Sequence, residues 1–197
     1  MQSERRPPTV FAASRIFGRR PRASRAGAAV LAGAMAACGF QPLSLWPLTL
    51  LAIAVLFELV ASTPRWREAF ALGWCFGLGH FTVGNTWIAT AFTYQANMPA
   101  WLGGIAVVLL ALYLAVFPAL ATLWAWLMAR PDRPGRSFWA LALAFAASWI
   151  VSEWMRGWVF TGFAWNPLGV ALLGQFGTRG LAIVTPSVAS ACSLAPG

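Results

Sequence analysis

The charged residues best placed for chemistry in this sequence are Glu153 and Arg156, which stand at the end of an apolar run. A spacing of three puts both side chains on one face of a helix, where they can pair. Charges kept beside apolar segments are costly and usually have a partner or a task. Two interpretations stay open: a structural ion pair that fixes the helix end, or a contact to a lipid headgroup or substrate. Trp158 and Trp165 follow closely and are candidates for the same contact.

The remaining reactive residue types form no catalytic set. All fourteen basic residues are Arg, so no Lys is present. The only histidine, His80, has no carboxylate placed to help it, and we favour a structural hydrogen bond for it. Cys38, Cys75 and Cys192 are widely spaced and fit no zinc or redox pattern. We therefore predict no catalytic residue, no metal and no cofactor in this chain.

Composition indicates which solvent surrounds the chain. Hydrophobic residues make up 59% of the 197 residues and charged residues only 10%, whereas a soluble domain carries about 25% charged residues. Twelve Trp fit a protein that lies in the membrane interface. The net charge of +9 could suggest nucleic acid, but the Arg residues cluster at the ends of apolar runs and form no stripe. We predict an all-α integral membrane protein with no nucleic-acid partner.

Five apolar runs predict a polytopic bundle of about five to six transmembrane helices. The runs cover residues 26–40, 46–61, 69–88, 101–128 and 138–156, and Pro118 predicts a kink in the fourth. With the N-terminus in the cytoplasm and one crossing per run, twelve of the fourteen Arg fall on the cytoplasmic side. A signal peptide is an alternative for the first run, because Met35-Ala36-Ala37-Cys38 loosely resembles a lipoprotein processing site.

Three regions follow from this division. Residues 1–25 form a basic cytoplasmic arm, residues 26–175 a membrane domain, and residues 176–197 a divergent or truncated tail. Within the membrane domain, residues 158–178 are interrupted by glycines and Pro167, which favours an irregular aromatic segment at the outer interface. Gly73, Gly77 and Gly84 share one face of the third run and predict close helix packing.

Two motifs give the chain a family resemblance. Gly39-Phe40-Gln41-Pro42, followed by Trp46-Pro47-Leu48, resembles the first hairpin of apolipoprotein N-acyltransferases. The segment from Glu153 to Trp165 resembles that family's E-x-x-R-G-W-x-x-T-G-F-P-W signature, with Ala164 in place of the usual Pro. The resemblance covers about residues 26–175.

The resemblance implies more than the residues show by themselves. Members of that family have eight spans and a periplasmic nitrilase-like domain with a Glu-Lys-Cys triad, which passes an acyl chain from a phospholipid to a lipoprotein. It implies membrane phospholipid and a lipoprotein substrate as partners, and the bacterial inner membrane as location. Because the sequence holds no Lys and stops before such a domain, we expect a truncation or frameshift near residues 175–179 and no activity alone. A transporter or permease fragment and a structural membrane protein are the alternatives.

Overall fold

The computed structural model describes residues 21–94, 99–129, 138–159, 162 and 166–172, and every regular element in these ranges is a helix. The all-α class predicted from the sequence is confirmed for this part of the chain. The elements are α2 (Arg22–Ala37), α3 (Trp46–Ala61), α4 (Trp66–Gly84), α5 (Thr86–Thr93), α6 (Ala100–Leu114), α7 (Val116–Met128), α8 (Phe138–Trp158) and the 3₁₀ helix η2 (Leu168–Leu172).

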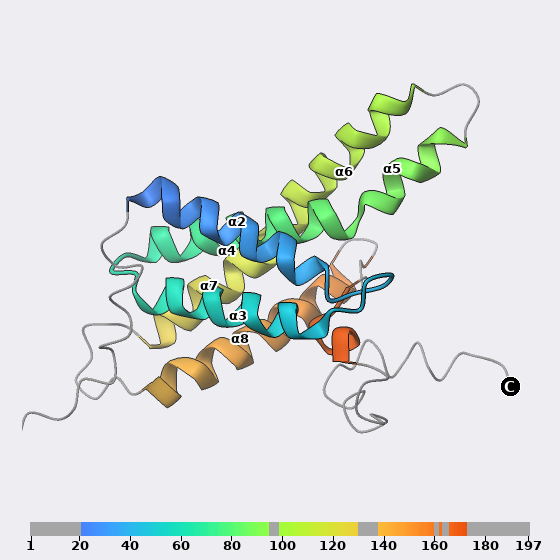
Figure 1. Cartoon of the computed structure of the whole chain (residues 1–197). Helices are drawn as coiled ribbons and strands as arrows, with labels where there is room; N and C mark the ends of the chain where they lie inside the picture. Colours follow the sequence, from blue (N-terminus) through green and yellow to red (C-terminus); the bar gives the residue numbers. More distant parts are fainter. Residues whose placement is uncertain (1–20, 95–98, 130–137, 160–161, 163–165, 173–197) are drawn as a thin grey trace, which may run out of the picture.

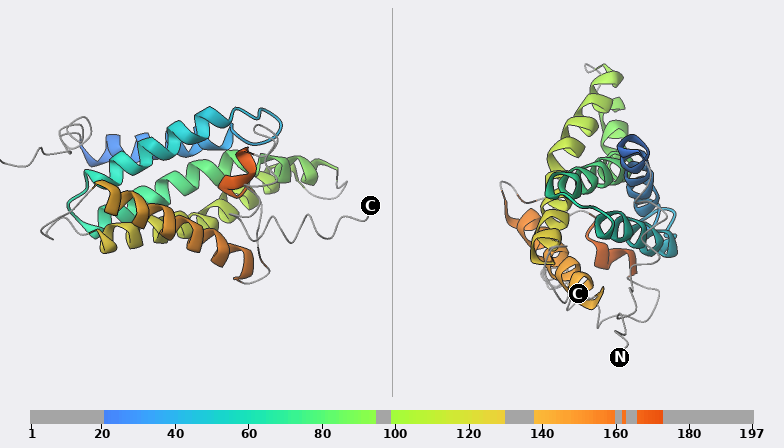
Figure 2. Two further views of the ribbon diagram at one scale, coloured as in Figure 1. Left: turned by 90° about the horizontal axis from the view of Figure 1, so that it is seen from below. Right: turned by 90° about the vertical axis from the view of Figure 1, so that its left-hand side faces the viewer.

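The helices α2, α3, α4, α7 and α8 form a bundle in which successive members run in opposite directions (Figure 1). α4 lies in the middle and packs on α2, α6 and α7, while α8 packs on α7. α5 and α6 form a hairpin that projects away from the bundle in both Figure 1 and Figure 2. The carboxyl ends of α2, α4 and α8 therefore lie at one end of the bundle.

Small residues bring α4 close to two neighbours. A Cβ added at Gly33 of α2 would collide with the backbone of Phe76, and one added at Gly79 would collide with the backbone of Val30. On the side facing α7, a Cβ at Gly77 would lie 2.7 Å from the Cα of Ala115, and one at Gly73 would lie 2.5 Å from the carbonyl oxygen of Pro118. Close backbone approach at small residues is how helices associate in lipid.

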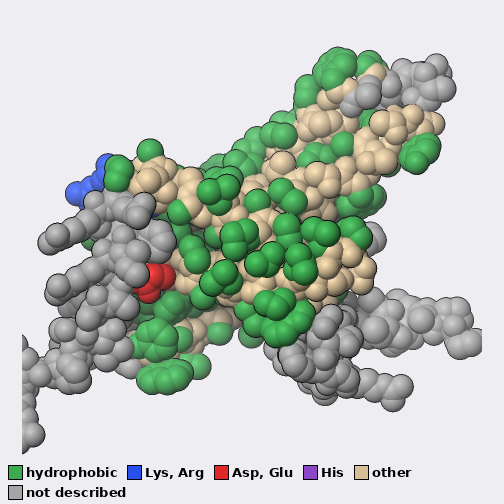
Figure 3. Space-filling model, viewed as in Figure 1, with side chains coloured by type: hydrophobic (Ala, Val, Ile, Leu, Met, Phe, Trp, Pro, Cys, Tyr) green, Lys and Arg blue, Asp and Glu red, His purple; other side chains and the backbone are tan. Residues whose placement is uncertain are grey.

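The largest buried cluster fills the space between α2, α3 and α4. Leu56 and Leu59 of α3 meet Phe76 of α4, and Trp126 of α7 and Phe145 of α8 complete the cluster. On the outside, hydrophobic side chains are spread along the face shown in Figure 3, and its coloured Arg and Glu side chains gather at one end.

Two breaks interrupt the apolar runs. The run predicted for residues 69–88 is not one helix, because α4 ends at Gly84 and α5 begins after Asn85. The run 101–128 breaks at Ala115, between α6 and α7. This break falls just before Pro118, which lacks the N–H that would bond to the carbonyl of Leu114. The predicted kink is thus present.

Length and hydropathy single out two helical stretches that can cross a membrane. Among the described residues, these are Trp101–Met128, which includes the break at Ala115, and Phe138–Trp158. Trp46–Ala61 is also apolar but shorter. The predicted boundaries of the second run coincide with α3, and those of the fifth lie within α8. The number of spans, predicted as five to six, stays a prediction.

Candidate functional site

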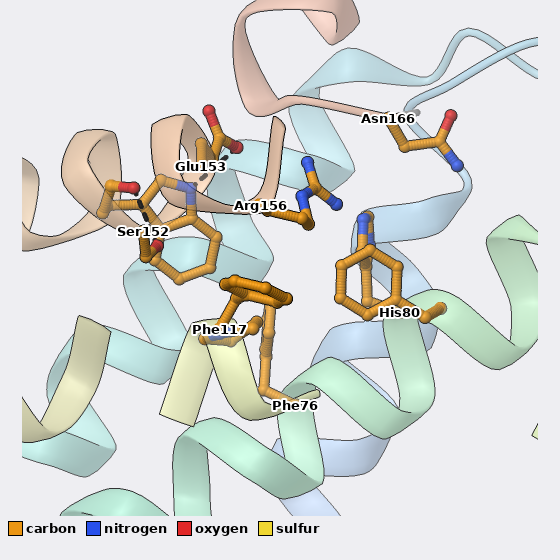
Figure 4. Close-up of a pocket in the computed structure, with 10 residues that line it drawn as sticks. Phe76, His80, Phe117, Ser152, Glu153, Arg156 and Asn166 are labelled. Carbon is orange, nitrogen blue, oxygen red and sulfur yellow. Dashed lines mark hydrogen bonds between the residues drawn. The ribbon is translucent and has the colours of Figure 1, made fainter. Parts of the chain in front are cut away.

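The C-terminal turns of α8 place Glu153 against the segment that follows the helix. One oxygen of its carboxylate, Oε1, accepts a hydrogen bond from the indole Nε1 of Trp149 at 3.1 Å. The same oxygen accepts a bond from the backbone N–H of Leu168 at 2.7 Å. Glu153 therefore links the start of η2 to α8. Figure 4 shows Glu153 among the residues that line the adjacent cavity.

Arg156 does not form the ion pair with Glu153 that their spacing allows. The two residues share α8, but no Asp or Glu oxygen of the described residues lies within 4.0 Å of the Arg156 guanidinium. Instead the guanidinium carbon lies 5.1 Å from the ring centroid of Phe81. The N–H groups of Trp149 and Leu168 both donate to Oε1 of Glu153 instead.

Burial makes this arrangement of Arg156 unusual. The residue is only 4% exposed, and a buried charge is expensive unless it is paired and hydrogen-bonded. The Glu153 carboxylate attracts Arg156 electrostatically but lies too far away for an ion pair. Figure 4 shows its guanidinium between Glu153 and the side chains of His80 and Asn166. A buried cation that keeps hydrogen-bonding capacity at the end of a bundle is suited to hold an anionic group.

The neighbours of Arg156 add further buried polar atoms. His80 is enclosed by the rings of Phe40, Phe76 and Phe81, with centroids 5.0–6.2 Å away. Its Nδ1 has no hydrogen-bond partner within the described structure. At the end of α4, the side-chain oxygen and nitrogen of the buried Asn85 have none either. Such orphaned atoms are rare in native structures and often mark an unplaced water or a functional site.

A small cavity joins several of these groups. It has a volume of about 20 Å³ and is lined by His80, Arg156, Asn166 and surrounding aromatic rings. A cavity needs roughly 10–15 Å³ to hold one water molecule. The cavity therefore has room for a water but not for a headgroup, so a larger ligand would have to meet Arg156 from the bundle end.

The remaining candidate residues are Trp158, Trp165 and the three glycines of α4. Trp158 is 75% exposed at the end of α8, and its ring lies 6.3 Å from that of Trp154. Trp165 lies outside the residues that the structure describes. Gly73 and Gly77 face α7, whereas Gly84 faces Asn166, whose Nδ2 donates a 3.4 Å hydrogen bond to the Gly84 carbonyl.

The thiols stand apart from the site. Cys38 and Cys75 are free and half-buried, and Cys38 donates a weak bond to the carbonyl of Ala34. Cys192 lies outside the described residues. Within the described ranges, no three His, Cys, Asp or Glu side chains come together as metal ligands.

A second polar cluster, at the opposite end of the bundle, was missed by sequence reasoning. Arg25 is 6% exposed, although the sequence placed it in the basic arm. Its guanidinium donates to the carbonyl of Leu59 at 2.9 Å, to the hydroxyl of Thr63 and to Glu68 at 3.3 Å. Trp126 of α7 joins the cluster by donating to the Thr63 carbonyl at 3.0 Å. The cluster connects α2, α3, α4 and α7. The first apolar run was predicted to begin at residue 26, whereas α2 begins at Arg22 and so includes Arg25.

Asn166 is another residue that sequence reasoning missed at the site. The only local signal for Asn166 is the Asn-Pro pair it forms with Pro167, which is typical of a turn. Asn166 has a positive φ of 52°, a conformation that Asn tolerates better than most residues.

Comparison with known proteins gives one consistent answer. The family model described as the apolipoprotein N-acyltransferase N-terminal domain matches residues 32–192. Relatives named apolipoprotein N-acyltransferase are similar to the chain. The protein of Ralstonia nicotianae is 44% identical over 145 residues, which are 73% of this chain and 27% of the relative. That of Chromobacterium violaceum is 41% identical over 156 residues, 79% of this chain and 29% of the relative. That of Rhodopseudomonas palustris is 36% identical over 178 residues, 83% of this chain and 32% of the relative. The chain thus spans less than a third of the length of these relatives.

Proposed function

This chain belongs to the apolipoprotein N-acyltransferase family, and we propose that it forms the membrane-embedded N-terminal part of such an enzyme. The resemblance seen in the motifs at residues 39–48 and 153–165 is thereby confirmed. In this proposal the bundle works in lipoprotein maturation, in which an acyl chain passes from a phospholipid to the N-terminus of a lipoprotein.

One observation carries the role of these residues: the buried Arg156 guanidinium has no described carboxylate within 4.0 Å. A guanidinium is well suited to bind phosphate, because its N–H donors form a planar fork. In the proposal Arg156 meets the phosphate of a membrane phospholipid at the end of α8. Glu153 is a positioning residue that holds η2 beside it. Trp158, exposed at the same end, lies in the headgroup region.

The proposed membrane position is that of a multi-pass protein of the bacterial inner membrane with a cytoplasmic N-terminus. The alternating directions of α2, α3, α4, α7 and α8 support it (Figure 1). So does the arginine asymmetry, because Arg65 and Arg67 lie at the end of the bundle opposite Arg156. The Arg156 end then faces the periplasm.

Labelling from each side of the membrane tests this orientation. In a variant whose native cysteines are replaced, Gln95→Cys is expected to react with an impermeant maleimide from the periplasm. Arg133→Cys is expected to react only after the membrane is opened. The reverse pattern would contradict the orientation.

The acyl-transfer chemistry itself is not expected from these 197 residues alone. Transfer through an enzyme thioester needs an activated thiolate and a group that stabilises the oxyanion. The Lys of the family's triad has no counterpart, because the sequence contains no Lys. The purified chain, given phospholipid and a diacylated lipopeptide, is therefore expected to yield no triacylated product.

A chimera tests the proposed function directly. In the Ralstonia nicotianae relative, the matched part of this chain replaces its counterpart, and the product is expressed in a bacterium depleted of its own N-acyltransferase. The chimera is expected to restore triacylated lipoprotein, measured by mass spectrometry of a model lipoprotein, with the intact relative as positive control. A chimera that reaches the membrane and purifies as a single species, yet leaves the lipoprotein diacylated, would refute the proposal.

A further inference from the structure

A wide groove opens at the end of the bundle opposite Arg156. It has a volume of about 640 Å³, and its lining comes from the start of α4, the first turn of α2 and the end of α7. Arg22, Arg65 and Arg67 line it together with Trp66 and Ala71. Small-molecule sites commonly occupy about 300–1,000 Å³, so the groove is large enough for a lipid headgroup.

The charge of the groove is positive and only partly compensated. Its carboxylate, Glu68, accepts bonds from both Arg22, at 3.0 Å, and Arg25, at 3.3 Å. No ion pair within the described residues engages Arg65 or Arg67, and both are exposed. Because α4 begins at Trp66, the positive end of its helix dipole points into the same region.

Aromatic and apolar groups continue the groove along the outside of α4. The guanidinium carbon of Arg67 lies 5.3 Å from the centre of the Trp66 ring, which is itself exposed. Ala71 and Trp74 lie four and seven residues beyond Arg67 on the same helical face, and both are exposed. A charged recess that opens onto an apolar helix face matches a molecule with an anionic head and a hydrocarbon tail.

We propose that this groove binds the phosphate of an anionic phospholipid, with its head between Arg65 and Arg67 and an acyl chain along Ala71 and Trp74. The site differs from the Arg156 end in both place and task, because it anchors the cytoplasmic end of the bundle. The proposed lipid site depends on the proposed membrane position but not on acyl transfer. An inactive chimera would therefore contradict the proposed function without contradicting this site.

Lipid retention by the purified chain tests the site. The chain in detergent is titrated with phosphatidylglycerol or with phosphatidylcholine of the same acyl chains, and bound lipid is counted by native mass spectrometry. Phosphatidylglycerol is expected to bind more tightly. In the double variant Arg65→Gln, Arg67→Gln, its affinity is expected to fall about 25-fold, since each basic residue near the surface contributes a factor of about five.

A matched variant separates the groove from net charge. Arg5→Gln, Arg6→Gln removes the same charge from the N-terminal arm and is expected to keep the affinity. Circular dichroism and thermal unfolding establish that both variants are folded. Equal affinities in all three proteins, or equal losses in the two variants, would overturn the proposal. So would displacement of the lipid by inorganic phosphate at equal concentration, because the site would then recognise phosphate without a membrane lipid.

Discussion

Each end of the bundle buries one arginine, and the two arginines have different kinds of partner. Arg25 is 6% exposed and donates to a carbonyl, a hydroxyl and a carboxylate on neighbouring elements. Arg156 is 4% exposed and, among the described residues, has the face of Phe81 but no carboxylate within 4.0 Å. Burial alone therefore does not reveal the role of a charge. Among the described residues the two differ in their partners: Arg25 has hydrogen-bonded acceptors on neighbouring elements, although its Nε has none, whereas Arg156 lies against the Phe81 ring.

The largest expected effect comes from removing Arg25. Arg25→Met is expected to destabilise the chain by about 3 kcal/mol, because it leaves buried acceptors and the Glu68 carboxylate short of a partner. The measurement is unfolding in mixed micelles of increasing denaturing detergent. Arg22→Met is the matched control: the side chain of Arg22 is 72% exposed, so its loss is expected to cost less than about 1 kcal/mol. Equal losses of stability in the two variants would show that the buried hydrogen bonds of Arg25 do not stabilise the bundle.

A smaller effect is expected at Glu153. Glu153→Ala removes the acceptor of two hydrogen bonds and is expected to cost about 1–3 kcal/mol in total. The amide of Leu168 should then exchange its hydrogen faster, which hydrogen-exchange mass spectrometry can follow. Glu153→Gln keeps an oxygen in place and is expected to preserve most of the protection. Unchanged exchange in Glu153→Ala would mean that η2 is held by other contacts.

The smallest change in stability is expected at Arg156. Arg156 makes no ion pair among the described residues, so its removal also removes the cost of burying a charge, and Arg156→Met is expected to shift the stability by less than about 1 kcal/mol. In the chimera, however, the same change should lower acyl transfer at least tenfold, and Arg156→Lys should restore part of it. A loss of stability as large as that of Arg25→Met would make Arg156 a structural residue.

Much of the helical layout could be predicted from the sequence, because long apolar runs bounded by Arg, Pro and Gly leave few alternatives. Residues 46–61 are an example, since the predicted run coincides with α3. The break at Asn85 could not be predicted, because apolar residues continue on both sides of it. Family membership was predictable from the two motifs, which are specific in their order of residues.

The chemistry of the site was less predictable than the helices. A spacing of three permits a bond between Glu153 and Arg156, but it does not reveal competing donors. One of these, the N–H of Leu168, comes from a segment fifteen residues away. Likewise, Arg25 looked like one member of a basic arm, and only the packing of α2 on α4 brings it beside Glu68.

At Ala115 a helix of the bundle, α7, meets a helix of the projecting hairpin, α6. Ala115 is completely buried and pressed against Gly77 of α4, so this junction is fixed in the bundle. On one side of Ala115 α7 packs on α4 and α8, and on the other α6 packs on α4 and on α5 of the projecting hairpin. With a rise of about 1.5 Å per residue, the 15 residues of α6 make an arm about 22 Å long. A rotation of one degree about Ala115 would displace the far end of such an arm by roughly 0.4 Å.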